Sequence, residues 1–151
     1  MKQQFIYLDN AATTKTRPEV VEAMVPYFSE LYGNPSSVYD FSTPCKKAIA
    51  ASRETIANAL GAKSNEIYFT AGGTEADNWA IKATADAYRS KGNHIITSKI
   101  EHHAVLHTCE YLEAQGFEVT YLDVDENGVV KLEELKKAIR PTTILISIMF
   151  A

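Results

Sequence analysis

Two periods of hydrophobic spacing alternate along the second part of the chain. Four short runs rich in apolar and β-branched residues predict strands, and stretches with apolar residues every three or four positions predict helices between them. The predicted strands are residues 66–70, 94–98, 117–122 and 143–149, and the predicted helices are residues 74–90, 104–115 and 132–139. Because each helix supplies the crossover that parallel neighbours require, the predicted fold class is α/β with a mostly parallel sheet and flanking helices.

The first part of the chain shows only helical spacing. One helix is predicted to begin at Pro18, a residue suited to a first turn, and to end before the segment 33–37. A second is predicted to follow Thr43-Pro44 and to stop at Gly61. The expected helix faces are Val21, Met24, Val25, Phe28 and Leu31 in the first helix, and Ile49, Ser52, Ile56, Ala59 and Leu60 in the second.

Composition narrows the class of protein. The chain has 151 residues, of which 46% are hydrophobic and 23% charged, so it resembles an ordinary globular domain or part of one. A formal net charge of −4 argues against a nucleic-acid surface built on general basicity. With two cysteines and no signal-peptide core near the start, we expect a reducing cytoplasm. Residues 144–151 are too short to span a bilayer, and because the chain stops in this strand-like run we expect a truncation.

A glycine loop follows the first predicted strand. In an α/β sheet, ligands bind beyond the carboxyl ends of the strands, and the sequence there is Ala71-Gly72-Gly73-Thr74-Glu75. Paired glycines, the Thr74 hydroxyl and the N-terminus of the following helix together outline a phosphate cradle. A plain capped turn accounts for the same residues equally well. The helix is predicted to carry small residues on its inner face, namely Ala76, Ala80, Ala83 and Ala87.

Histidines cluster after the second predicted strand. His103 and His107 have the spacing with which a helix presents two imidazoles to a metal. Cys109 points elsewhere on that helix and no further ligand shows a recognised spacing, so we expect no metal. The favoured interpretation is that one histidine at the strand's end faces a crevice shared with the glycine loop, as a stacking plane or proton donor. Surface histidines at a helix start remain the alternative.

Two other features suggest chemistry that their context does not support. The stretch from Asp123 to Gly128, with Glu134 beyond it, matches the calcium-loop pattern. It follows a strand instead of a helix, so we interpret it as an acidic turn that uses Asn127-Gly128 for positive φ values. Cys45 near a helix start is either a reactive thiolate or, more simply, a packed small side chain, and Cys109 is expected in the core.

Five motifs, in order along the chain, resemble the cysteine desulfurases of the NifS and IscS type. They are Tyr7-Leu8-Asp9-Asn10-Ala11-Ala12-Thr13-Thr14, Gly33-Asn34-Pro35-Ser36-Ser37, Phe69-Thr70-Ala71-Gly72-Gly73-Thr74-Glu75-Ala76-Asp77-Asn78, Ile96-Thr97-Ser98-Lys99-Ile100-Glu101-His102-His103-Ala104-Val105-Leu106 and Ala138-Ile139-Arg140-Pro141. The sequence departs from this family at Tyr39, where many relatives have His, and at Ser42, where they commonly have Gly. These departures concern the substrate mouth and leave the cofactor assignment intact.

The resemblance implies a class-V aminotransferase-like enzyme of fold type I that depends on pyridoxal 5′-phosphate. Such enzymes take sulfur from L-cysteine, release L-alanine and leave a persulfide on an enzyme cysteine. It implies that Gly73 and Thr74 bind the cofactor phosphate and that His102 stacks on the cofactor ring and takes part in catalysis. Asn10 and Asn34 are expected to border the substrate mouth.

The resemblance also sets the expected organisation. Residues 1–15 are a segment that packs with the small domain, and residues 16–151 are an incomplete large cofactor domain. The family's Schiff-base lysine and persulfide cysteine would lie further along, so this chain alone is expected to be inactive. The parent enzyme is expected to be a cytoplasmic homodimer that hands sulfur to a scaffold protein for iron–sulfur cluster assembly or to tRNA thiolation, without binding nucleic acid or membrane. A selenocysteine lyase, another class-V enzyme or a non-catalytic phosphate-binding domain are the alternatives.

Overall fold

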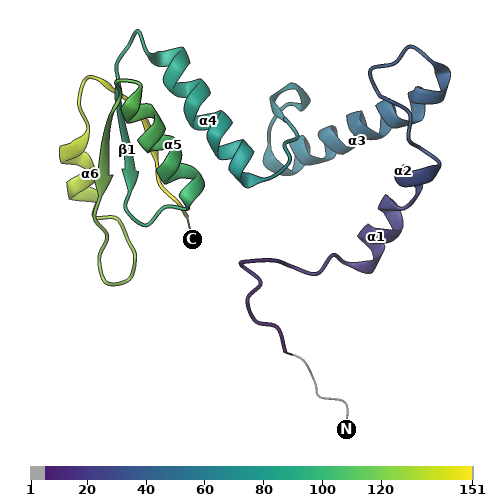
Figure 1. Cartoon of the computed structure of the whole chain (residues 1–151), viewed down its shortest axis with the longest axis horizontal. Helices are drawn as coiled ribbons and strands as arrows, with labels where there is room; N and C mark the ends of the chain where they lie inside the picture. The colour runs from purple at the N-terminus through teal and green to yellow at the C-terminus, as the bar shows by residue number, and fades with distance from the viewer. Residues whose placement is uncertain (1–5, 151) are drawn as a thin grey trace. The chain divides into compact units, whose positions relative to one another are not determined.

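The structure, a computed structural model, describes residues 6–150 and divides into two compact units, residues 1–68 and 69–151 (Figure 1). The predicted boundary after residue 15 refers to the small domain of a whole enzyme and stays a prediction. Residues 1–5 of that segment, and residue 151 at the end of the predicted large domain, lie outside the described residues. Among the described residues, no helix has the length and apolarity needed to cross a membrane.

The first unit is helical. Its elements are α1 (Pro18–Met24), α2 (Pro26–Ser29), the 3-10 turn η1 (Asp40–Ser42), α3 (Thr43–Leu60) and the 3-10 turn η2 (Ser64–Glu66). The single helix predicted from Pro18 onward is two helices, because Pro26 has no N–H to continue the first. The stop predicted at Gly61 is confirmed, since Gly61 has φ of 67° and closes α3 in the left-handed region.

Cys45 illustrates how this unit is held together. Its thiol, near the start of α3, is buried and donates a hydrogen bond to the Leu31 carbonyl at 3.1 Å. The structure therefore supports the packed alternative for this cysteine. Most of the expected apolar face of the first helix is exposed, including Val21, Met24 and Phe28.

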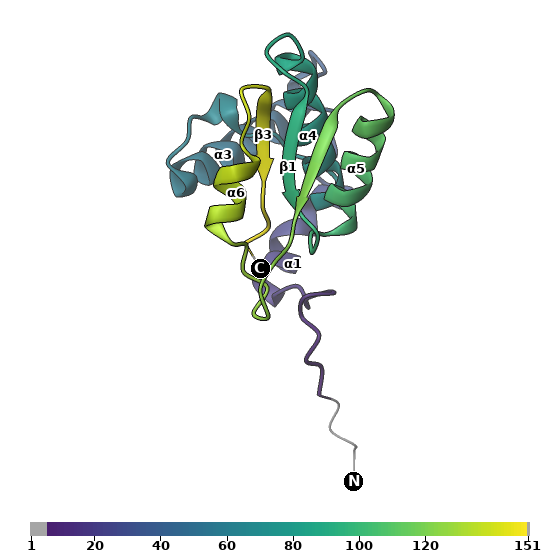
Figure 2. The same ribbon diagram turned by 90° about the vertical axis from the view of Figure 1, so that its left-hand side faces the viewer.

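The second unit is a parallel α/β layer. Its elements are α4 (Gly73–Tyr88), β1 (His94–Ser98), α5 (His103–Ala114), β2 (Glu118–Leu122), α6 (Leu132–Ala138) and β3 (Thr143–Ser147). The sheet has the order β2-β1-β3 and both pairings are parallel, which confirms the predicted fold class. Figure 2 shows α6 in front of the sheet and α4 behind it.

The predicted strand at residues 66–70 is wrong. Residues 64–66 form the turn η2, and residues 67–70 lie outside the sheet. Ile67 is extended, but its carbonyl accepts a hydrogen bond from the Arg53 side chain at 3.1 Å. An extended segment becomes a strand only where a neighbouring strand takes up its backbone groups, and none of the described strands does so here.

The core lies between the sheet and the pair α4 and α5. Its buried members are Ile81, Ala85, Ile95, Val105, Cys109, Leu112 and Phe117. The predicted core position of Cys109 is confirmed, and burial, followed by the charges of nearby glutamates, raises the pKa of its thiol to about 11. The predicted inner alanine face of α4 is wrong: Ala76, Ala80, Ala83 and Ala87 are exposed. Ile81 and Ala85 share the same helical period and face the core, because the larger isoleucine gains more from burial.

The amino ends of the three strands are joined through His94. This residue is fully buried, and its Nδ1 and Nε2 lie 2.7 Å from the Thr143 hydroxyl and 2.8 Å from the Thr120 hydroxyl. Arg140 adds hydrogen bonds to Thr120 and to the Glu118 carboxylate. Burial, and then the charge of Arg140, lower the pKa of His94 below its ordinary value of 6.5. At this edge, a neutral imidazole thus links the three strands through hydrogen bonds at both of its nitrogens.

Candidate cofactor-binding site

The opposite edge of the sheet carries the predicted site residues. Because the strands are parallel, the loops that follow β1, β2 and β3 all leave this edge, and the N-termini of α4 and α5 lie there as well (Figure 1). Gly73, Thr74 and His102 belong to these two helix starts. Asn10 and Asn34 belong to the first unit.

The glycine loop leads directly into α4. Gly72 is the N-cap in an extended conformation and the helix begins at Gly73, so the N–H groups of residues 73–75 precede the first intrahelical bond, from the Ala76 N–H to the Gly72 carbonyl. The Thr70 hydroxyl donates to the Gly72 carbonyl at 3.1 Å, and the Glu75 carboxylate accepts from the Ala71 N–H at 2.6 Å. These two bonds engage the Gly72 carbonyl and the Ala71 N–H, and neither of them involves the N–H groups of residues 73–75.

The space beside this loop can receive a ligand. An open hollow of about 530 Å³ is lined by Ala71, Gly72, Gly73, Thr74, Glu75 and Asn78. A Cβ built on Gly72 or Gly73 would meet no atom within 4 Å, so nothing in the described chain fills the room that the glycines leave. Helix amides, the positive end of the helix dipole and a threonine hydroxyl are the donors that a phosphate dianion prefers. The residues present therefore fit the phosphate end of pyridoxal 5′-phosphate.

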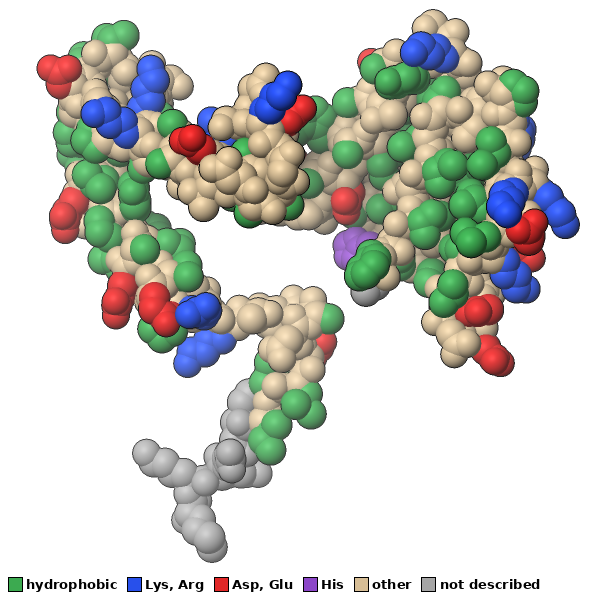
Figure 3. Space-filling model, turned by 180° about the vertical axis from the view of Figure 1, so that it is seen from behind, with side chains coloured by type: hydrophobic (Ala, Val, Ile, Leu, Met, Phe, Trp, Pro, Cys, Tyr) green, Lys and Arg blue, Asp and Glu red, His purple; other side chains and the backbone are tan. Residues whose placement is uncertain are grey.

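His102 is held as the N-cap of α5. Its backbone is extended, with φ of −59° and ψ of 146°, and its Nδ1 accepts a hydrogen bond from the Ala104 N–H at 3.1 Å. This bond leaves the ring proton on Nε2. The side chain is exposed, and Figure 3 shows histidine side chains gathered on the surface of the second unit. His102 thus offers both an aromatic face and one N–H donor.

The two helix starts are linked by Asn78. Its side-chain amide donates to the Thr74 carbonyl at 3.0 Å in its own helix and to the Ala104 carbonyl at 3.4 Å in α5. The N–H of Ala104 is also the group that donates to the His102 imidazole. The Asn78 side chain therefore connects the start of α4, with its candidate phosphate donors, to the start of α5, where His102 lies. The sequence patterns did not indicate this connection.

The other two histidines of the cluster pair with each other. The rings of His103 and His107 stack with centroids 5.3 Å apart, and His107 Nδ1 lies 2.9 Å from the Glu110 carboxylate. Within residues 6–150, no three His, Cys, Asp or Glu side chains come together as a metal site would require. Of the cluster, His102 is the N-cap of α5 beyond the carboxyl end of β1, and His103 is the first residue of that helix.

The acidic stretch after β2 is a turn. The Asp125 carboxylate accepts hydrogen bonds from the N–H groups of Asn127 and Val129, each at 2.9 Å, and these bonds lower the pKa of Asp125. Val124 and Val130 pair as an antiparallel bridge across it. The turn interpretation is confirmed, except that only Gly128, with φ of 80°, takes a positive φ.

The predicted substrate-mouth residues organise their own loops. Asn34 is exposed, and its side-chain oxygen accepts from the Ser36 N–H at 2.9 Å. The Asn10 carbonyl accepts from the Thr14 hydroxyl at 3.1 Å. Their proposed role toward a substrate stays a prediction.

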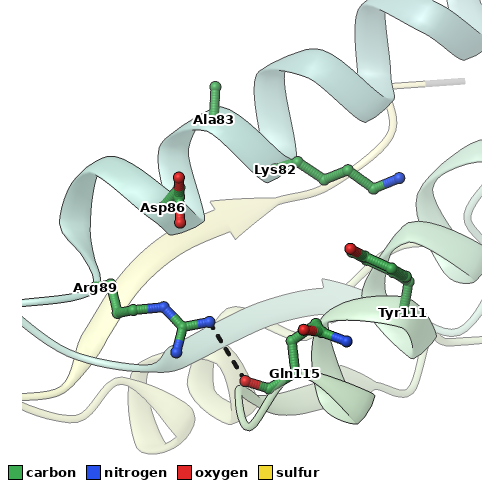
Figure 4. A pocket seen from close by; sticks show the side chains of 6 residues that line it. All are labelled: Lys82, Ala83, Asp86, Arg89, Tyr111 and Gln115. Atoms are coloured by element: carbon green, nitrogen blue, oxygen red, sulfur yellow. Dashed lines mark hydrogen bonds between the residues drawn. The ribbon is translucent and has the colours of Figure 1, made fainter.

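A second hollow, of about 330 Å³, lies between α4 and α5, away from the carboxyl ends of the strands (Figure 4). Its cations already have partners: the Lys82 ammonium lies 4.5 Å from the Tyr111 ring centroid, and Arg89 lies 4.6 Å from the Phe117 ring centroid and donates to the Gln115 carbonyl at 3.3 Å. These contacts cover the seam between the helices. The carboxyl edge therefore remains the candidate site.

Among known proteins, the chain is similar in sequence to proteins named as cysteine desulfurases. A cysteine desulfurase IscS of Methanosarcina thermophila is 65% identical over 146 residues, which is 97% of this chain and 36% of that protein. One from Dictyoglomus turgidum is 58% identical over 100% of this chain and 38% of that protein. The chain thus spans less than two-fifths of the length of these relatives.

Solved structures show the same relation. A NifS-like protein superposes with a TM-score of 0.93 at 43% identity, over 97% of this chain and 40% of that one. The structure of SspA in complex with cysteine has a TM-score of 0.88 at 43% identity, over 94% of this chain and 41% of that one. The pattern of the aminotransferase class-V family matches residues 6–151. The glycine loop and the capping histidine thus lie in a chain that belongs to the aminotransferase class-V family.

Proposed function

We propose that this chain is the N-terminal, cofactor-binding part of a pyridoxal 5′-phosphate-dependent cysteine desulfurase. The observation that carries the proposal is the pair of helix starts at the carboxyl edge, one with amides and a hydroxyl suited to phosphate and the other capped by an exposed imidazole. Relatives named as cysteine desulfurases, at up to 65% identity among those compared above, support it. The parent enzyme takes sulfur from L-cysteine and yields L-alanine and an enzyme persulfide.

Each residue has a defined task in this proposal. The amides of Gly73 and Thr74 and the Thr74 hydroxyl bind the phosphate, and the imidazole of His102 stacks on the pyridine ring while its Nε2–H is available as a donor. The cofactor, when bound, supplies an electron sink for bond cleavage at the amino-acid substrate. Asn78 keeps the phosphate donors and the imidazole in one arrangement. Asn10 and Asn34 border the substrate mouth.

The proposal extends to the setting of the enzyme. We expect a cytoplasmic homodimer that passes sulfur to an acceptor scaffold protein for iron–sulfur cluster assembly or to tRNA thiolation. A chain of this net charge, −4, is not suited to binding nucleic acid directly.

The test joins residues 1–151 to the part of the Methanosarcina thermophila relative that this chain does not cover. L-alanine release from L-cysteine is measured against the concentration of pyridoxal 5′-phosphate. Thr74→Val removes a hydroxyl that bonds a charged phosphate, so the cofactor concentration for half-maximal rate should rise about tenfold or more. The matched control is Thr55→Val, since the Thr55 hydroxyl is exposed and bonds only the Ala51 carbonyl of its own helix.

Two outcomes would contradict the proposal. If the chimera binds the cofactor but releases no alanine from L-cysteine, the proposed desulfurase activity is wrong. Release from L-selenocysteine alone would identify a selenocysteine lyase instead.

A further inference from the structure

Glu101 is the only carboxylate among the buried residues that the structure describes, with 7% of its surface exposed. Its Oε1 accepts a hydrogen bond from the Ser98 hydroxyl at 2.8 Å and another from the Met149 N–H at 2.7 Å. Removing a carboxylate from water costs several kcal/mol unless such bonds replace its hydration. The two short bonds therefore replace part of the hydration that burial removes from this carboxylate.

The two donors come from different strands. Ser98 is the last residue of β1, and Met149 lies two residues beyond the end of β3. On the other side, the N–H of Lys99 donates to the Leu122 carbonyl at 3.0 Å, and its ammonium pairs with Asp123 at 2.7 Å. The loop that follows β1 is thus fastened to both neighbouring strands, and Glu101 makes the attachment to β3.

This attachment lies next to the candidate site. Glu101 immediately precedes His102, so the bonds that fix the carboxylate also fix the backbone from which the imidazole projects. The chain leaving β3 is held at the same point through Met149. A side chain that acted only as packing would not need a charged acceptor shared by a hydroxyl and an amide.

We propose that Glu101 is a positioning residue: its carboxylate fastens the loop that carries His102 to the chain leaving β3, and so holds the imidazole in place for the cofactor ring. The inference rests on the proposed function, because it names what orients a residue of that same site. The hydrogen bonds themselves do not depend on it.

The test uses the 151-residue chain and has two readouts. The first is hydrogen exchange of the Met149 amide, measured by NMR. The second is the response of the His102 ring and of the Gly73 amide to pyridoxine 5′-phosphate, a probe that has the phosphate and ring of the cofactor but no aldehyde to react with lysines.

In Glu101→Ala the Met149 amide should exchange at least about tenfold faster, since its acceptor is gone. The His102 ring should lose its response to the probe, while the Gly73 amide keeps it. Glu101→Gln retains an oxygen that accepts both bonds and should restore the ring response. Glu110→Ala, which removes an exposed carboxylate bonded to His107, should change neither readout. If Glu101→Ala does not fold, Glu101→Asp, one methylene too short to reach both donors, should show the same two changes.

The outcomes separate the two claims. If the wild-type chain responds at Gly73 and His102 but Glu101→Ala or Glu101→Asp keeps the ring response, the positioning role is overturned and the proposed function stands. If the wild-type chain does not respond to the probe at all, the proposed function and the positioning role are both overturned, whatever the exchange rate of Met149.

Discussion

The two edges of the sheet each hold a histidine, and the two histidines differ in burial and in hydrogen bonding. His94 at the amino edge is fully buried, and both ring nitrogens lie within 2.8 Å of threonine hydroxyls. His102 at the carboxyl edge is exposed, and its Nδ1 accepts a hydrogen bond from the Ala104 N–H. The same side chain therefore cross-links strands at one edge and, in the proposed site, offers an exposed imidazole to the cofactor ring at the other.

The difference lies in how the neighbouring strands satisfy polar groups. At the amino edge, β2 and β3 each present a threonine to His94, and Arg140 completes the network with Glu118. At the carboxyl edge, α4 and α5 begin beside the strand ends, and the N–H groups of residues 73–75 precede the first intrahelical bond of α4.

The largest effect should come from removing the amino-edge histidine. His94→Ala leaves a cavity and removes one hydrogen-bond partner from each of the Thr120 and Thr143 hydroxyls, so the free energy of unfolding should fall by about 3 kcal/mol. The measurement is urea denaturation of the 151-residue chain. His107→Ala, which removes an exposed histidine, should change it by less than about 0.5 kcal/mol. If the free energy of unfolding falls by similar amounts in the two variants, the buried histidine contributes no more to stability than the exposed one, and the comparison is wrong.

Acid should weaken the amino edge first. The pKa of His94 is lowered in the folded chain by burial and by Arg140, with Glu118 acting in the opposite sense, whereas in the unfolded chain it returns to about 6.5. The unfolded state therefore binds the proton more readily, and stability should fall as the pH drops below 6.5 toward the lower folded pKa. Denaturation midpoints from pH 8 to pH 5 should fall more steeply for the wild type than for His94→Gln. Equal slopes would show that His94 does not carry this proton linkage.

A smaller stability change than that of His94→Ala should come from the carboxyl edge, where the cap and the ring of His102 can be separated. His102→Ala loses the acceptor for the Ala104 N–H and should cost about 1 kcal/mol, measured by the same denaturation. His102→Asn supplies another good N-cap, so stability should recover while binding of pyridoxine 5′-phosphate remains weakened. If His102→Asn binds as well as the wild type, the imidazole ring has no part in the site.

Much of the second unit follows from its sequence pattern. The spacing of apolar residues predicted β1, β2 and β3 and the helices between them, because each of these elements buries a face against its neighbours. The segment 66–70 has the composition of a strand but no strand partner among the described residues, and pattern alone cannot supply one. The alanines of α4 have helical spacing, yet Ile81 decided which side of that helix is buried.

The candidate site was predictable in its main residues but not in its supports. Glycine pairs and helix N-termini indicate anion sites by local chemistry, so Gly73 and Thr74 could be named from sequence. The role of Glu101 could not be named from sequence, because its partner Met149 lies 48 residues away and contributes a backbone N–H that no residue type reveals. The spacing of Ser98 and Glu101, three residues apart, was the one local signal of their bond.

The most direct test of the central claim is a titration of the 151-residue chain with pyridoxine 5′-phosphate, followed by NMR of assigned amides and histidine rings. Unphosphorylated pyridoxine and inorganic phosphate are the matched probes. We predict shifts at the Gly73 and Thr74 amides with both phosphate-bearing probes, and a shift of the His102 ring only when ring and phosphate are joined. Shifts confined to other surfaces, such as the hollow of Lys82 and Arg89, or no shifts at these three residues, would contradict it.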